Sequence, residues 1–131
     1  MDESEERALQ EFSELQDKVI GQAEYSSRVQ QQERLLGIQR QRCILTKQEL
    51  QAMPDQTIMY KSIGRAYFCS PKPDVLKELD DKAAQMEGDA KSLREQREAL
   101  DKKMKDTEAQ LRELIGQSPA LARRLGAVKI Q

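Results

Sequence analysis

Few side chains in this 131-residue sequence are suited to chemistry. It contains no histidine, two cysteines (Cys43 and Cys69) and adjacent carboxylates at Glu5-Glu6 and Asp80-Asp81. Without histidine there can be no Ser-His-Asp triad, Cys-His pair or histidine-based metal site. The cysteines form no CxxC pair, and no glycine-rich phosphate-binding loop occurs. We therefore predict no catalytic residue, metal or cofactor, and interpret the thiols as reduced packing groups and the acid pairs as surface charge.

The composition predicts long helices in place of a globular core. Charged residues make up 34% of the sequence and aromatic residues 4%, with no tryptophan. A chain with so few bulky groups but much Glu, Lys, Arg, Gln, Leu and Ala is typical of a coiled coil. Lys and Arg number 22 against 23 Asp and Glu, and this balance argues against a dedicated nucleic-acid-binding protein. An acidic start and the lack of any long apolar run predict no signal peptide and no membrane span, hence a cytoplasmic protein.

The prolines divide what we interpret as a single domain, residues 1–131. Pro54, Pro71 and Pro73 gather near the middle, and proline disrupts helix interiors. We expect a helix over about 5–51, a β-hairpin region over about 52–74, a helix over about 75–116 and a C-terminal tail over 117–131. Thr46-Lys47-Gln48-Glu49 also matches a capping box, which predicts a short helix restarting after a break near Ile44.

Both predicted helices carry apolar residues at alternating steps of three and four. In the second helix the positions at this spacing are all apolar except Arg97 and Thr107. They are Leu76, Leu79, Ala83, Met86, Ala90, Leu93, Arg97, Leu100, Met104, Thr107, Leu111 and Leu114. The first helix has a weaker series: Phe12, Leu15, Val19, Gln22, Ser26, Val29, Glu33, Leu36, Arg40 and Cys43. Such a 3.5-residue repeat indicates a coiled coil, in preference to a lone amphipathic helix on a globular core.

The equal arms and the long interruption favour an antiparallel hairpin of helices over a parallel homodimer. If paired residue numbers sum to 126, Phe12 meets Leu114, Leu15 meets Leu111 and Arg97 faces Val29. A slip of one heptad remains an alternative. The predicted fold class is thus mainly α: a long antiparallel coiled-coil helical hairpin with one central β-hairpin.

The central segment is rich in β-branched and aromatic residues, which favour strands. We expect strands near 57–60 and 65–69, joined by a four-residue loop over Lys61–Gly64 in which Gly64 adopts a positive φ. A lone hairpin is marginal in water and leaves open edges, so we expect hairpins of several chains to pair into one sheet. The alternative is a hairpin folded back on the helix ends. The residues predicted to carry assembly are Ile58, Tyr60, Ile63, Gly64, Tyr67 and Phe68.

This pattern resembles the β class of prefoldin subunits from roughly Leu9 to Leu114. The hairpin string Thr57-x-Met59-Tyr60-x-x-Ile63-Gly64-Arg65-x-Tyr67 looks like that of the subunit 1 members of the class. Phe12-x-Glu14-Leu15-Gln16-x-Lys18-Val19-Ile20 looks like their first-helix opening, and Leu45-Thr46 followed by Glu49 looks like their pre-hairpin segment.

The resemblance implies a subunit of a heterohexamer of two α-class and four β-class chains. In such a complex the hairpins form a double β-barrel body, and six coiled-coil tentacles hold unfolded or nascent polypeptides such as actin and tubulin. The complex passes these clients to the cytosolic chaperonin without using nucleotide, so the resemblance implies a chaperone subunit and not an enzyme.

We place client binding at the free ends of the two arms, because helix ends fray and expose apolar side chains. Gly116, Pro119 and Gly126 are expected to loosen the second arm there. The alternative is that these residues only complete the coiled-coil seam. The predicted client-binding residues are Leu9, Phe12, Leu15, Val19, Leu111, Leu114, Ile115, Leu121 and Leu125.

Two other functions compete with a chaperone subunit. A structural coiled-coil scaffold or tether would explain the heptads equally well, but it has no evident use for an aromatic β-hairpin. A nucleic-acid-binding zipper would need a basic block before its heptads, whereas the residues before Leu9 are acidic. The basic pairs Lys102-Lys103 and Arg123-Arg124 are interpreted as solvated helix faces, so we expect no nucleic-acid partner.

Overall fold

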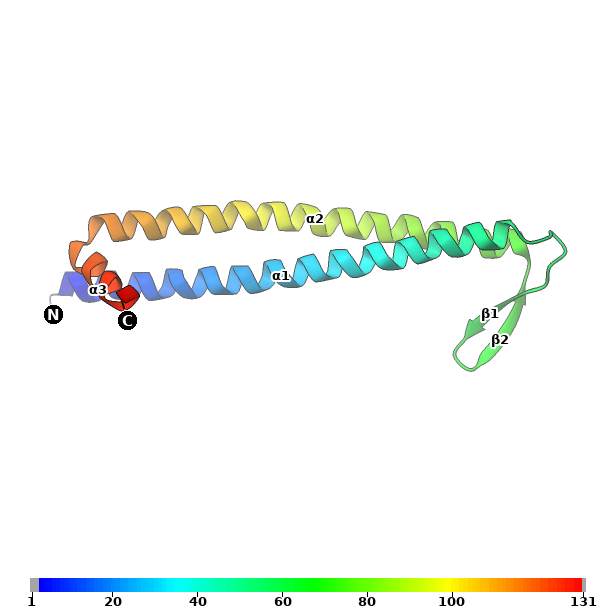
Figure 1. The fold of residues 1–131 in the computed structure, drawn as a ribbon, viewed down its shortest axis with the longest axis horizontal. Coiled ribbons are helices and arrows are strands. Elements are labelled where there is room, and N and C mark those ends of the chain that lie inside the picture. The colour runs from blue at the N-terminus through cyan, green and yellow to red at the C-terminus, as the bar shows by residue number, and fades with distance from the viewer. Residues whose placement is uncertain (1–2, 131) are drawn as a thin grey trace. The chain divides into compact units, whose positions relative to one another are not determined.

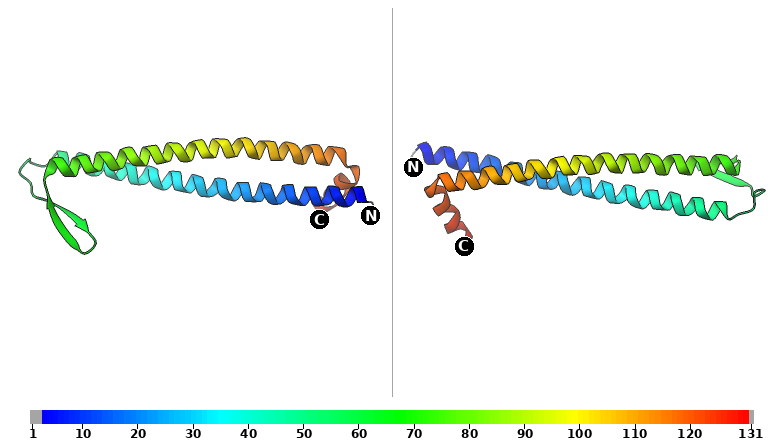
Figure 2. Two further views of the ribbon diagram at one scale, coloured as in Figure 1. Left: turned by 180° about the vertical axis from the view of Figure 1, so that it is seen from behind. Right: turned by 90° about the horizontal axis from the view of Figure 1, so that it is seen from above.

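The computed structural model describes residues 3–130 of the chain. In order, the elements are α1 (Glu3–Gln51), β1 (Met59–Ile63), β2 (Ala66–Ser70), α2 (Lys72–Gln117) and α3 (Pro119–Ile130) (Figure 1). The chain divides into two compact units: a terminal unit, Met1–Val29 with Gln96–Gln131, and a hairpin unit, Gln30–Glu95. Within each unit a stretch of α1 lies antiparallel beside a stretch of α2 (Figures 1 and 2). The predicted helical hairpin with a single β-hairpin is confirmed.

Helix α1 is continuous over 49 residues and contains no proline. Its first turn carries Glu3, Glu5 and Glu6, whose charges are favourable at the positive end of a helix. The predicted break near Ile44 is wrong, because the capping-box residues lie inside the helix, where α2 packs beside them. The helix ends at Gln51, shortly before Pro54, which disfavours helical geometry at the residue before it.

The heptad pattern is confirmed in both long helices. Every predicted seam position is partly or fully buried, including the polar positions Gln22, Ser26 and Arg40. Val29 is 3% exposed in α1 and Thr107 is 2% exposed in α2. The Thr107 hydroxyl donates a hydrogen bond of 2.9 Å to the Lys103 carbonyl, so this polar group is buried without losing its partner.

Ion pairs fix the register of the helices in the hairpin unit. Arg40 pairs with Glu87 at 2.7 Å, and Lys47 pairs with Asp80 at 2.6 Å. Both pairs of residue numbers sum to 127, one more than the predicted 126. A slip of one heptad would move these partners about 10 Å apart along the helix, so that alternative is excluded in this unit.

The β-hairpin has a tighter turn than predicted. Its register runs from Met59 opposite Ser70 to Ile63 opposite Ala66, which leaves Gly64 and Arg65 as a two-residue turn. Gly64 adopts φ 61°, as expected for the first central residue of a type II′ turn. The predicted four-residue loop and the strand bounds 57–60 and 65–69 are therefore wrong. This turn matches the twist of paired strands, so pairing extends to the residues beside it.

The C-terminal segment, which we described only as a tail over 117–131, forms the helix α3. The Ser118 Oγ accepts a hydrogen bond of 3.4 Å from the Leu121 backbone N–H, and Pro119 occupies the first helical position. A serine cap followed by proline is a favourable helix start, because proline lacks the N–H that would otherwise need a partner. Pro119 therefore begins α3, while Gly116 lies inside α2 and Gly126 inside α3.

Candidate functional site

The two strands expose almost all of their side chains. Antiparallel pairing places Tyr60 and Tyr67 on one face of the hairpin, and Ile63 and Phe68 on the other face with Met59. Tyr67 is 74% exposed, Tyr60 64%, Ile63 54% and Phe68 53%. Met59, at 7%, is the buried member of the strands. Both faces therefore carry large apolar side chains that the hairpin unit does not cover.

The face that carries Met59 is anchored to α2 by a polar contact. Lys61 donates a hydrogen bond to Glu78 and forms an ion pair with it, and Lys82 lies 3.9 Å from the same carboxylate oxygen. The Lys61 hydrogen bond holds the pKa of Glu78 below its ordinary value against the opposing effect of burial, and the positive charges of Lys61 and Lys82 add to it. This contact positions the hairpin on the helices and leaves the face with both tyrosines free.

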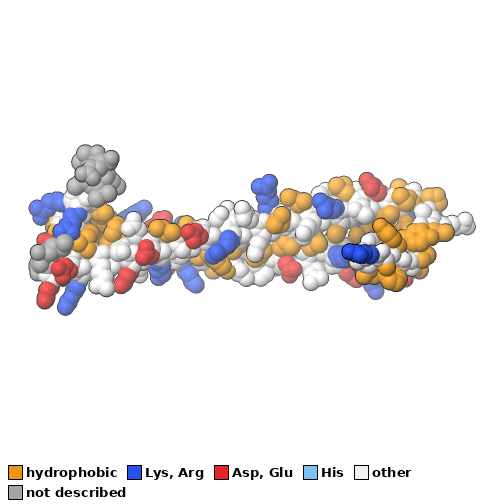
Figure 3. Space-filling view, turned by 90° about the horizontal axis from the view of Figure 1, so that it is seen from below, with side chains coloured by type: hydrophobic (Ala, Val, Ile, Leu, Met, Phe, Trp, Pro, Cys, Tyr) orange, Lys and Arg blue, Asp and Glu red, His pale blue; other side chains and the backbone are white. Residues whose placement is uncertain are grey.

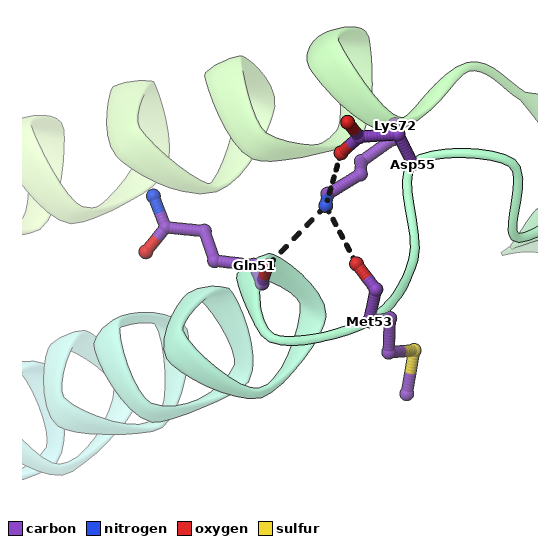
Figure 4. Close-up of polar contacts among 4 residues, drawn as sticks. All are labelled: Gln51, Met53, Asp55 and Lys72. Carbon is purple, nitrogen blue, oxygen red and sulfur yellow. Dashed lines mark hydrogen bonds and ion pairs between the residues drawn. The ribbon is translucent and has the colours of Figure 1, made fainter.

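A second anchor closes the end of α1. Lys72 donates hydrogen bonds to the Met53 carbonyl at 2.9 Å and the Gln51 carbonyl at 3.3 Å, and it pairs with Asp55 at 3.0 Å (Figure 4). The last carbonyls of a helix lack intrahelical donors, and a cation there also interacts favourably with the helix dipole. Lys72 thus ties the first turn of α2 to the last turn of α1, at the base of the hairpin.

The predicted client-binding residues all lie in the terminal unit. The structure brings two of them together, because Leu15 of α1 and Leu114 of α2 line the same cleft of about 570 Å³. A neighbouring depression of about 500 Å³ lies where Ala8 and Leu114 meet Pro119 of α3. Eight of the nine predicted residues are partly buried: Leu9, Phe12, Leu15, Val19, Leu111, Leu114, Ile115 and Leu125.

Leu121 differs from the other eight. It is 2% exposed and is one of the two most buried large side chains among the described residues. Leu121 therefore serves as the anchor of α3 in the folded terminal unit. Sequence reasoning missed this helix, although the Ser118-Pro119 pair was a readable signal for it.

Two further observations concern the described residues 3–130. No helix among them is long and apolar enough to cross a membrane. Cys43 is partly buried and Cys69 is exposed, both as free thiols.

Comparisons with known proteins agree with this geometry. A family model described as prefoldin subunit matches residues 6–118. Prefoldin subunit 1 of Arabidopsis thaliana is 35% identical over 87% of this chain and 89% of its own length. The probable prefoldin subunit 1 of Dictyostelium discoideum is 28% identical over 81% of this chain and 92% of its own.

A solved structure shares the fold. The crystal structure of the prefoldin beta subunit from Thermococcus strain KS-1 matches with a TM-score of 0.72 and 20% identity, covering 79% of this chain and 90% of that one. The matched family model spans both long helices and the strands between them. The chain belongs to the prefoldin subunit family.

Proposed function

We propose that the chain is a subunit of a heterohexameric co-chaperone that works without ATP. In this proposal the complex forms in the cytosol from α-class and β-class prefoldin subunits. It binds unfolded or nascent polypeptides, such as actin and tubulin, and transfers them to the cytosolic chaperonin. The chain itself binds and positions other proteins and catalyses no reaction.

The observation that carries the proposal is the exposed hairpin on a chain of this family. A two-stranded sheet is marginal alone, and here it offers two open edges and aromatic side chains on both faces. Pairing with strands of neighbouring subunits would satisfy the free backbone groups and bury Tyr60, Tyr67 and Phe68. A scaffold or tether built from heptads alone would not require such a surface.

The clefts of the terminal unit support client binding. Leu15 and Leu114 are partly buried and line a cleft together with charged residues that include Glu11, Glu14 and Lys18. Apolar side chains beside charged ones suit extended segments of unfolded chains, which share hydrophobicity but no sequence. One such contact contributes only about 1–2 kcal/mol, so useful retention requires several subunits to hold one client together.

The test measures how well a complex reassembled with the sister subunits prevents a denatured client from aggregating, by light scattering. Leu9, Leu114 and Ile115 are changed together to Ser. If the variant loses about 1 kcal/mol of binding free energy to the client, it retains the client about fivefold more weakly. A higher concentration of the complex is then needed for equal protection.

Ile20→Ser is the matched control, since Ile20 is 52% exposed in the same unit and outside the clefts. It should protect as well as the parent. If the triple variant assembles and protects equally well, the client site is not on these residues. If the parent complex itself gives no protection, the chaperone proposal fails and a tether becomes the better account.

A further inference from the structure

The hairpin unit carries a second apolar stripe, on the side of α1 away from α2. Leu35 is 59% exposed, Ile38 49% and Leu45 51%. Their neighbours Leu36, Arg40 and Cys43 are partly buried in the seam, so the two stripes lie on different faces of one helix. We name the exposed set of Leu35, Ile38, Arg42, Leu45 and Glu49 the outer stripe.

The spacing of the outer stripe is that of a coiled-coil seam. Its members follow one another at alternating steps of three and four residues, as in the seam that faces α2. Between them lies a depression of about 370 Å³, formed on α1 alone and lined by Ile38, Gln41, Arg42, Leu45, Thr46 and Glu49. A hole between the side chains of one helix is the site that receives a knob from a second helix.

The stripe distinguishes α1 from α2. Among the described residues, α2 exposes no large hydrophobic side chain comparable to Leu35, Ile38 or Leu45. Single exposed apolar residues are ordinary, but three at heptad spacing on one helix face mark a surface for a partner. Within the hairpin unit, Figure 3 shows several groups of hydrophobic side chains at the surface.

We propose that the outer stripe is a second coiled-coil seam, and that its occupant is an amphipathic helix with acidic flanks from a neighbouring subunit. This inference rests on the proposed function, because it assumes assembly through the hairpin. The outer stripe lies in the last turns of α1, at the end of the helix pair from which the strands extend (Figures 1 and 2). A subunit that pairs with the strands would therefore bring its own helices close to this end of α1.

Charge argues for an acidic partner and against a second copy of this chain. Arg42 lies within the stripe and Arg34 lies beside it, both exposed, whereas Glu49 lies at its end. Gln41, which also lines the depression, is uncharged. Arg34 and Arg42 outnumber Glu49, so this face has a net positive charge. A second copy would repeat that charge, whereas acidic flanks on another subunit would complement it.

The first experiment measures incorporation into the complex. Leu35→Ser, Ile38→Ser and Leu45→Ser are combined, and the variant competes with the parent for the sister subunits, with the products read by native mass spectrometry. We expect at least about tenfold weaker incorporation of the triple variant. Arg42→Glu, which keeps a good helix former, should also incorporate more weakly, and the deficit should shrink at high salt. A matched change of Gln32, Gln39 and Gln48 to Ser should leave incorporation unchanged.

The second experiment identifies the occupant. A photo-cross-linking amino acid at position 38 in the assembled complex should join a helix of a sister subunit. Cross-linking instead to a client, to the chaperonin or to a second copy of this chain would overturn the proposal, as would equal incorporation of the triple variant. In those cases the complex still forms and the proposed function stands. If the parent chain does not assemble with the sister subunits, both proposals fail.

Discussion

Lys72 shows how one side chain can hold an irregular segment in place. Its side chain is 11% exposed and reaches two carbonyl oxygens, whereas the Asp55 side chain that it also contacts is 98% exposed. A hydrogen bond from a buried charge to a backbone carbonyl contributes more than an ion pair in open solvent. The backbone contacts, and not the ion pair, therefore account for most of the effect of Lys72.

This difference can be measured with two variants. Lys72→Met should lower the free energy of unfolding by about 1–2 kcal/mol, because the last carbonyls of α1 lose their donor. Asp55→Asn should cost less than about 0.5 kcal/mol, as for other exposed pairs. Denaturant unfolding followed by circular dichroism gives both values. Equal losses in the two variants would show that the ion pair carries the contact.

Because Lys61 and Glu78 join the hairpin to α2, the position of the hairpin on α2 should be sensitive to acid. The folded pKa of Glu78 lies below the ordinary value of 4.5, so the contact stabilises the fold above pH 4.5 and is lost as the pH falls through the lowered value. In NMR spectra, the β1 amide signals should therefore shift as the pH falls below 4.5. Glu78→Gln should abolish that response, and a Glu78 carboxyl that titrates at or above its ordinary pKa would contradict the assignment.

At the scale of elements, the sequence predicted what repeats and missed what depends on a single contact. The seam from Leu76 to Leu114 was readable, because burial recurs at every third or fourth residue of a straight helix. The turn was misjudged because Gly64 fits several hairpin loops, and the pairing of Ile63 with Ala66 selects one of them. The anchoring of Lys61 on Glu78 and of Lys72 on α1 joins elements distant in sequence, which periodicity cannot show.

The stability of helix α3 should depend on the buried side chain of Leu121. Leu121→Ala should remove about 2 kcal/mol or more of packing, because Leu121 is 2% exposed. Since α3 depends on this anchor, its amides should exchange with solvent about thirtyfold faster, while those of α2 near Leu100 keep their protection.

Leu125→Ala is the matched control, because Leu125 is only partly buried and its truncation should accelerate exchange less. Exchange of α3 amides that is unchanged in Leu121→Ala would mean that the helix does not depend on this side chain. In that event Leu121 would remain a candidate for direct client contact in the folded unit.

At the scale of the whole molecule, each unit presents its own surface to other proteins. The hairpin unit offers open strand edges and exposed aromatic side chains, and the terminal unit offers clefts in which leucines lie beside charged residues. Few of the described side chains are fully buried, so partners that bind the folded chain would add to its stability.

Native mass spectrometry of the chain mixed with its sister subunits tests assembly through the hairpin. The parent and Gly64→Asn should each give a six-chain complex, because Asn tolerates the positive φ of this turn. Gly64→Val should not enter the complex, because a β-branched residue resists φ 61°, although a Cβ at this position would meet no neighbouring atom within 4 Å. A homodimer of the parent, or normal incorporation of Gly64→Val, would contradict assembly through the hairpin.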